Sequence, residues 1–217
     1  MISASDIQIG PEHFRYLCVQ RGEIARMQHD RSMWDRLYRA VIDETYRSIR
    51  PHLPRSPMRT LDIGSGLGGI NILLYRHYNG RLHIDLLDGI ADKPQVQVHR
   101  ETFNNMGVAR DFLRMNGVEG RKISHIDAAS PIFPRGLQYG LITSFGSWCF
   151  HFPPSVYINF VLDNVWTGGT TLILDVRKGK PDWMLDLEAA FGKPRAIISL
   201  SDKMSRVIFR VGHQYAV

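Results

Sequence analysis

The sequence predicts an α/β protein whose mostly parallel sheet is covered by helices on both faces and ends in an antiparallel hairpin. Short apolar β-type runs alternate with stretches of helical spacing from about residue 59 onward. A glycine-rich turn follows the first of these runs, and the last two runs are joined by only four residues. With 217 residues, 44% hydrophobic and 22% charged, the chain is long enough to bury one core of this kind.

Residues 1–55 are expected to form a helical N-terminal extension, and residues 56–217 the main domain. Apolar residues of the extension recur at three- and four-residue steps, so one stripe of a helix should lie against a core. The stripe consists of Trp34, Leu37, Tyr38, Val41, Ile42, Thr45 and Ile49. Pro51 and Pro54 should end this helix.

Strand and helix patterns then alternate along the main domain. Strands are expected at 59–63, 82–88, 122–127, 139–144 and 170–176. Helices are expected from Ile70, over about 104–115, from Pro153 through Val156, Phe160, Val161 and Val165, and over 182–191. Such alternation is typical of a doubly wound parallel sheet.

The C-terminus departs from this alternation. The β-runs 195–200 and 205–211 are separated by 201–204, which is too short for a right-handed crossover helix. The two runs should therefore pair antiparallel, and the last strand should be reversed.

The glycine turn has the pattern Gly64-x-Gly66-x-x-Gly69 between a predicted strand and a predicted helix. Glycines permit a tight turn and a close approach of the backbone to a ligand, and the helix beyond presents free N–H groups. The pattern alone fits a dinucleotide or S-adenosylmethionine. Asp62 favours the second, because an anion there would repel a pyrophosphate but could accept a hydrogen bond from an ammonium group. The reversed last strand, and the roughly 150 residues after the turn, also disfavour a two-domain dehydrogenase.

The run Leu61-Asp62-Ile63-Gly64-Ser65-Gly66-Leu67-Gly68 resembles the first motif of class I S-adenosylmethionine-dependent methyltransferases. The inferred order of elements matches that family from about residue 56 to the end. The resemblance implies a seven-stranded sheet with the last strand antiparallel, and S-adenosyl-L-methionine as the cofactor. The cofactor-binding residues it implies are Asp62, Gly64, Ser65, Gly66, Gly68, Asp88, Gly89, Asp127, Ala128 and Ser144.

Two of these carboxylates have specific roles in the resemblance. Asp88, 24 residues after Gly64, resembles the acidic residue that binds both ribose hydroxyls. Asp127 resembles the residue that accepts a hydrogen bond from the adenine amino group. The alternatives are a solvated turn residue for Asp88 and an ordinary strand-end or capping aspartate for Asp127.

The segment 144–154 lies where the family places its fourth motif, beside the reacting methyl group. It lacks the Asn/Asp-Pro-Pro-aromatic pattern of amino-directed methyltransferases, which counts against methylation of exocyclic amines in nucleic acid. His151 is the candidate general base, because histidine titrates nearest to neutral pH and this one follows the fourth strand. The alternatives are a structural histidine or no base. Trp148, Phe150 and Phe152 could line the substrate pocket or simply pack in the core.

Further substrate contacts are expected from two regions. Arg177, with Lys178 and Lys180, follows the fifth strand and could hold a phosphate or carboxylate, or be merely solvated. Residues 27–34 resemble the lid of many small methyltransferases, with His29 as a rival base and Trp34 as a substrate contact.

Composition and charge narrow the partners. A net charge of +6 is compatible with nucleic acid, but it is spread along the chain, +2 over residues 1–55 and +4 over the other 162. No apolar run is long enough to span a membrane, no secretory signal is recognisable, and no spacing indicates a metal site, so we expect a cytoplasmic protein without a catalytic metal.

The sequence therefore predicts a methyltransferase acting on a small polar molecule, at a hydroxyl of a sugar-like compound or other metabolite. One alternative is an RNA or DNA methyltransferase. Another is a binding module that keeps the fold without catalysis.

Overall fold

The computed structural model describes residues 2–13, 31–89, 105–130 and 132–212. The chain forms two compact units: Met1–Pro51 with Gly66–Ala129, and His52–Ser65 with Ser130–Val217. The boundary between them passes through the glycine turn, between Ser65 and Gly66. The expected division into a helical N-terminal extension, 1–55, and a main domain, 56–217, stays a prediction.

Seven strands are hydrogen-bonded in the order β3-β2-β1-β4-β5-β7-β6. Their bounds are β1 Arg59–Ile63, β2 His83–Asp88, β3 Ile123–Asp127, β4 Leu141–Ser144, β5 Thr170–Arg177, β6 Ala196–Ser201 and β7 Met204–Val211. Helices alternate with the first five strands along the chain, except between β3 and β4. The predicted fold class, an α/β protein with a seven-stranded sheet, is confirmed.

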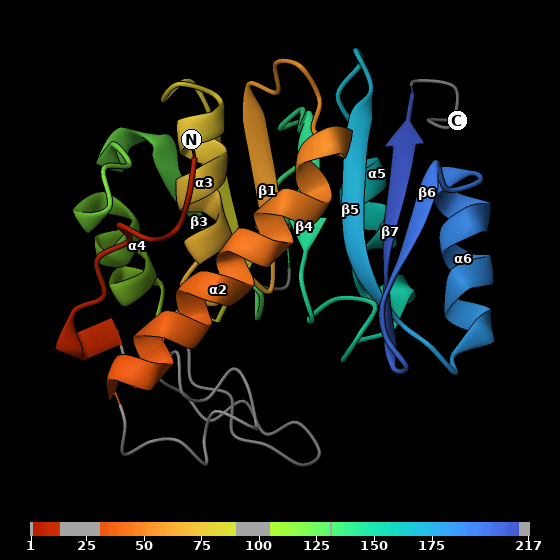
Figure 1. The fold of residues 1–217 in the computed structure, drawn as a ribbon. Helices are drawn as coiled ribbons and strands as arrows, with labels where there is room; N and C mark the ends of the chain where they lie inside the picture. Colours follow the sequence, from red (N-terminus) through yellow and green to blue (C-terminus); the bar gives the residue numbers. More distant parts are fainter. Residues whose placement is uncertain (1, 14–30, 90–104, 131, 213–217) are drawn as a thin grey trace. The chain divides into compact units, whose positions relative to one another are not determined.

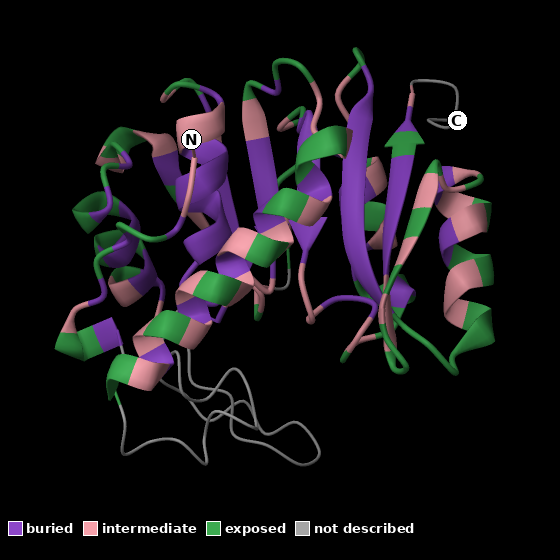
Figure 2. Cartoon of the chain, viewed as in Figure 1, coloured by how far each residue is buried: buried purple, intermediate pink, exposed green. Residues whose placement is uncertain are grey.

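The second unit contains β1, β4, β5, β7 and β6. The first three pair in parallel, whereas β7 lies between β5 and β6 and runs antiparallel to both (Figure 1). The predicted hairpin and reversed last strand are therefore confirmed. Strand β5 is buried over Thr170–Val176 (Figure 2) because both of its faces are covered. Helix α6, Pro181–Phe191, connects β5 to β6 and buries Leu187 and Phe191.

The helix expected from Pro153 is shorter than the sequence predicts. A 3-10 turn, η4 Pro154–Val156, is followed by a single short helix, α5 Ile158–Leu162. Asn164 ends it, because its amide group donates to the carbonyls of Phe160 and Pro134. The chain then turns away, so Val165 pairs with Tyr139 instead of extending the apolar face of the helix.

The first unit pairs β2 with β3 in parallel and packs three helices: α2 Arg31–Ile49, α3 Gly69–His77 and α4 Met106–Met115. Two 3-10 turns, η2 Arg50–His52 and η3 Gly120–Lys122, complete the named elements. Helix α3 begins against α2, where a Cβ on Gly69 would overlap the hydroxyl of Tyr38. The third glycine of the turn is thus required for close packing between helices.

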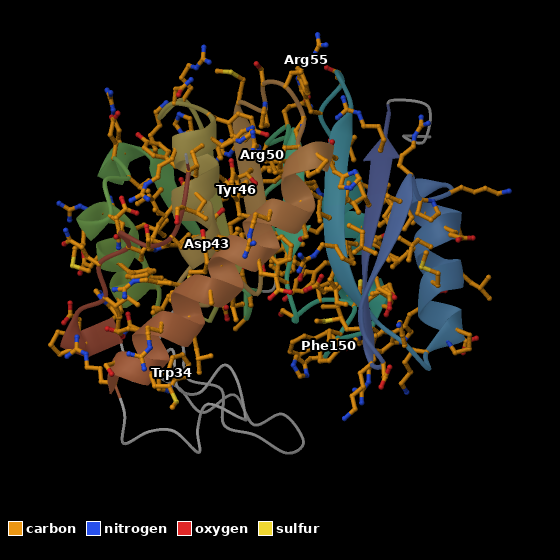
Figure 3. All side chains as sticks on the ribbon, in the orientation of Figure 1. Trp34, Asp43, Tyr46, Arg50, Arg55 and Phe150 are labelled. Atoms are coloured by element: carbon orange, nitrogen blue, oxygen red, sulfur yellow. The ribbon has the colours of Figure 1, made fainter. Side chains whose placement is uncertain are left out.

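Helix α2 buries a narrower stripe than the sequence predicts. Trp34, Tyr38, Ile42, Tyr46 and Ile49 are buried, and Figure 3 shows Trp34 near the start of the helix and Tyr46 near its end. The remaining members of the predicted stripe, Leu37, Val41 and Thr45, are only partly buried. Tyr46 was not predicted, since burying its hydroxyl requires a partner. That partner is Nδ1 of His77, 2.8 Å from the Tyr46 oxygen.

Residues near the N-terminus are held on this unit by side chains that bond to the backbone. The carboxylate of Asp43 accepts from the amide of Ala4 at 2.7 Å. The amide group of Asn116, at the end of α4, exchanges two hydrogen bonds with the backbone of Gln8, at 2.7 and 2.9 Å. These contacts attach the start of the chain to α2 and α4.

Three histidines of the first unit, one buried and two partly buried, predict a loss of stability in mild acid. Burial, and then the charge of Arg50, lower the pKa of His77 below its usual value. Burial also lowers the pKa of His13 and His125. The unfolded chain binds these protons more readily, so the free energy of unfolding should decrease as the pH falls below about 6.5, by up to about 1.4 kcal/mol per pH unit for each histidine.

Urea unfolding between pH 7 and 5 measures this dependence. The H77Q variant should show a flatter decrease than the wild type, because one of the three protonation sites is gone. An equal slope in the two proteins would show that His77 does not contribute.

Candidate functional site

The glycine turn joins β1 to α3 through left-handed backbone. Gly64, Gly66 and Gly68 have φ angles of 67°, 54° and 69°, a region that glycine adopts without strain. At Gly64 a side chain is excluded by lack of space as well, because a Cβ there would overlap the side chain of Ser147. The turn therefore lies directly against the segment that follows β4.

The carboxyl ends of β1 and β4 are linked by buried side chains. Asp62 is 2% exposed, and one of its carboxylate oxygens accepts from the hydroxyl of Thr143 at 3.0 Å. The hydroxyl of Ser144 donates to the carbonyl of Ile63 at 2.8 Å and accepts from the amide of Trp148 at 3.0 Å. Ser144 thus positions the chain after β4, and its predicted contact with the cofactor stays a prediction.

Residues 145–152 form what we call the post-β4 loop. Trp148 is fully buried at its centre, where the indole N–H donates to the carbonyl of Pro154 at 3.1 Å. Its ring meets those of Tyr157 and Phe191 edge to face. This burial favours the packing role for Trp148 over the substrate contact, which stays a prediction.

Cys149 shows that packing imposes the shape of this loop. Its φ angle is 65°, a conformation that costs a non-glycine residue on the order of 1–3 kcal/mol. Two backbone hydrogen bonds hold it: its amide donates to the carbonyl of Phe152, and its carbonyl accepts from the amide of Arg177, both at 2.9 Å. Burial raises the pKa of the thiol well above its usual value, so Cys149 is not a reactive thiolate.

The tip of the loop brings three of the residues singled out in the sequence together. The His151 side chain is exposed, and its ring stands perpendicular to that of Phe150, with centroids 4.9 Å apart. The guanidinium carbon of Arg177 lies 5.7 Å from the centre of the Phe150 ring. Figure 3 shows Phe150 beyond the ends of β4 and β5.

A buried ion pair lies under the start of the loop. Arg206 in β7 donates through Nε and Nη2 to the two carboxylate oxygens of Asp175 in β5, at 2.8 and 3.0 Å. The same guanidinium lies over the ring of Phe145, 4.7 Å from its centre. Sequence analysis missed this pair; the available signal was an acidic residue, Asp175, within one mostly apolar run and a basic residue, Arg206, within the other.

In the first unit, Asp88 lies at the end of β2 against the glycine turn. Its Oδ2 accepts from the amide of Gly66 at 2.7 Å, and its Oδ1 accepts from the amide of Gly89 at 2.8 Å. The carboxylate is therefore fixed in orientation.

Asp127 is the neighbour of Asp88 in the register of β2 and β3. Its Oδ1 accepts from the amide of Ala129 at 2.9 Å, which is the strand-end capping role that the sequence left open. The amide of Ala128 donates to the carbonyl of Asp88 at 3.0 Å. A contact between Asp127 and an adenine ring stays a prediction.

The remaining sequence-predicted residues are less informative. Trp34 is fully buried in α2, and His29 lies outside the described residues. In the described part of the chain, no group of three or more His, Cys, Asp or Glu side chains is arranged to hold a metal ion. Nor is any described helix long and apolar enough to cross a membrane.

Comparison with known proteins finds similarity in structure alone. No family model matches the sequence, and no curated protein is significantly similar to it. A solved S-adenosylmethionine-dependent methyltransferase from Aquifex aeolicus is similar with a TM-score of 0.55 and 12% identity, over 76% of this chain and 88% of that one.

Two further solved structures have comparable similarity. A Streptococcus pneumoniae protein proposed to be a tRNA methyltransferase, in complex with S-adenosyl-L-methionine, has a TM-score of 0.55 and 16% identity over 79% of this chain and 73% of that one. A precorrin-6y C5,15-methyltransferase from Geobacter metallireducens has a TM-score of 0.51 and 14% identity over 80% and 87%. At such identities the likeness shows a shared fold, and it confirms the family resemblance at that level.

The buried ion pair predicts a strong effect of removing one partner. D175N should lower the free energy of unfolding by about 3–5 kcal/mol, because the charge of Arg206 would remain buried without its carboxylate. The matched double variant D175L/R206M should recover most of this loss, since apolar side chains replace both charges. Urea unfolding measures both, and equal losses in the two variants would contradict the explanation.

Proposed function

We propose that this protein is an S-adenosylmethionine-dependent methyltransferase that acts on a hydroxyl of a small polar molecule. The observation that carries the proposal is the antiparallel β7 between β5 and β6, on the sheet whose first strand leads into the glycine turn. A dinucleotide-binding fold would continue in parallel with the order 3-2-1-4-5-6. The strand order therefore favours a methyl donor over a nicotinamide as the ligand of the turn.

The proposed cofactor contacts suit the chemistry of S-adenosylmethionine. Asp88, a carboxylate whose orientation is held by Gly66 and Gly89, would accept from the ribose hydroxyls. Asp62, a buried carboxylate at the end of β1, favours a cationic ligand group such as an ammonium. Backbone groups of the turn would contact the methionine moiety. The remaining proposed contacts are Gly64, Ser65, Gly68, Asp127, Ala128 and Ser144.

His151 is the proposed general base. When bound, the cofactor supplies an electrophilic methyl group, and an acceptor hydroxyl must lose its proton as it is methylated. The exposed imidazole at the tip of the post-β4 loop can take that proton and pass it to solvent. The strained, doubly hydrogen-bonded Cys149 would keep the tip in a fixed position while this occurs.

Methylation of RNA or DNA is the second candidate, and the net charge of +6 is the observation that favours it. The post-β4 loop disfavours it, because the loop lacks the Asn/Asp-Pro-Pro-aromatic sequence of enzymes that methylate exocyclic amines. Affinity for an oligonucleotide that falls steeply with salt would support this second function.

Calorimetric titration with S-adenosylmethionine and with NAD tests the cofactor. We expect binding of the first only, and D88A should weaken it by roughly 10- to 100-fold, the equivalent of about 1.5–3 kcal/mol for charge-assisted hydrogen bonds. D111A, which removes an exposed carboxylate of α4, is the matched control and should bind normally. Binding of NAD without S-adenosylmethionine would overturn the proposed function.

Replacing His151 tests the proposed base. In H151A, methyl transfer from labelled S-adenosylmethionine to the small-molecule fraction of a cell extract should fall by about 10²- to 10⁴-fold, while cofactor affinity is unchanged. H52A, in the turn after α2, is the control and should retain full activity. Wild-type activity in H151A would remove His151 from the mechanism without affecting the cofactor assignment.

A further inference from the structure

We propose that the methyl acceptor carries an oxyanion, a phosphate or a carboxylate, and that Arg177 binds it at the edge of the post-β4 loop. This inference rests on the proposed function and specifies its substrate class. Three cations lie at the end of β5 and just after it, and the structure places them in different surroundings.

Two of these cations, Lys178 and Lys180, contact other parts of the chain. The Nζ of Lys178 donates to the hydroxyl of Ser199 at 2.8 Å and to the carbonyl of Ser201 at 2.7 Å, so it ties the end of β5 to β6. The Nζ of Lys180 lies 5.9 Å from the ring centre of Trp183, in the first turn of α6. Of these three cations, all in the described part of the chain, Arg177 is the one with a side-chain contact to the post-β4 loop, through the ring of Phe150.

The guanidinium of Arg177 is available to a ligand. The side chain is exposed, and within the described ranges it makes no hydrogen bond or ion pair. It lies over the ring of Phe150. An aromatic ring beside a guanidinium orients the group while leaving its N–H donors for a ligand, and the planar fork of these donors matches a phosphate or carboxylate.

The backbone fixes where this fork lies. The amide of Arg177 donates to the carbonyl of Cys149 at 2.9 Å, so the end of β5 is attached to the centre of the loop. Phe150, the next residue, contacts both Arg177 and the ring of His151. One aromatic ring therefore separates the proposed base from the free guanidinium, which is an arrangement suited to an acceptor with a hydroxyl and an anionic group.

The charge around this position favours an anion. Residues 177–183 and 199–204 contain four cations and two carboxylates, a net charge of +2. The amide of Lys178 donates to the carbonyl of Lys203 at 2.9 Å, which brings the two segments together. The local field thus adds to the attraction of the single guanidinium.

The experiment follows Arg177 directly by ¹⁵N–¹H NMR with S-adenosylhomocysteine present at saturation. Inorganic phosphate and acetate are titrated separately, so that the two kinds of oxyanion are distinguished. We expect saturable shifts of the Arg177 Nε–H signal and of the Phe150 amide with at least one ion. R177M should bind that ion roughly tenfold or more weakly, and R177K should be intermediate because a point charge replaces the fork.

R195M is the matched control. Arg195 is also exposed, but it precedes β6. Strands β5 and β6 are both antiparallel to β7, so they run in the same direction, and the start of β6 lies at the opposite end of the strands from the end of β5. This variant should bind the ion as the wild type does. Equal affinity in R177M and the wild type, or binding of neither ion, would overturn the proposal. Oligonucleotide binding that falls steeply with salt, with neither ion binding at Arg177, would overturn it in favour of nucleic acid.

The affinity for S-adenosylhomocysteine is measured separately by calorimetry. If it does not bind, the proposed function fails, and the phosphate and acetate titrations of the free protein still decide whether Arg177 is an anion site. If it binds but neither ion does, the proposed function stands and the inference on the acceptor fails.

Discussion

The missing side chain at Gly64 is the constraint on which the candidate site depends. Its positive φ angle turns the chain out of β1, and the space beside it is filled by Ser147. Any larger residue would displace the post-β4 loop and strain the turn together. Two segments separated by about 80 residues in sequence are thereby held in contact where a ligand of the turn would bind.

The post-β4 loop is held by interactions that oppose the intrinsic backbone preference of one of its residues. Cys149 keeps a left-handed backbone because hydrogen bonds to Phe152 and Arg177 hold it on both sides. Below it, the Asp175–Arg206 pair is removed from water, which contributes little net stability but fixes the position of Phe145. Strain in the loop and buried charge in the strands beside it are what a site that requires precise positioning would show.

The roles of individual residues were less predictable than their positions. Asp88 could be located from its spacing to the turn, and its contact with Gly66 now shows how it is oriented. Trp148 was a candidate for the substrate pocket, yet its indole is fully buried with Pro154 as its partner. A sequence pattern does not distinguish an aromatic residue that lines a pocket from one that fills a core, because both are apolar and both follow a strand.

The sequence by itself determined the elements, the reversed last strand and the glycine turn, because these follow from local periodicity, link length and glycine spacing. The tertiary structure alone decided which side chains meet: Tyr46 with His77, Asp175 with Arg206, and Arg177 with Phe150. These partners are far apart along the chain, and no local preference specifies them. Burial then determines which of them is committed to the fold, and exposure leaves Arg177 available for a ligand.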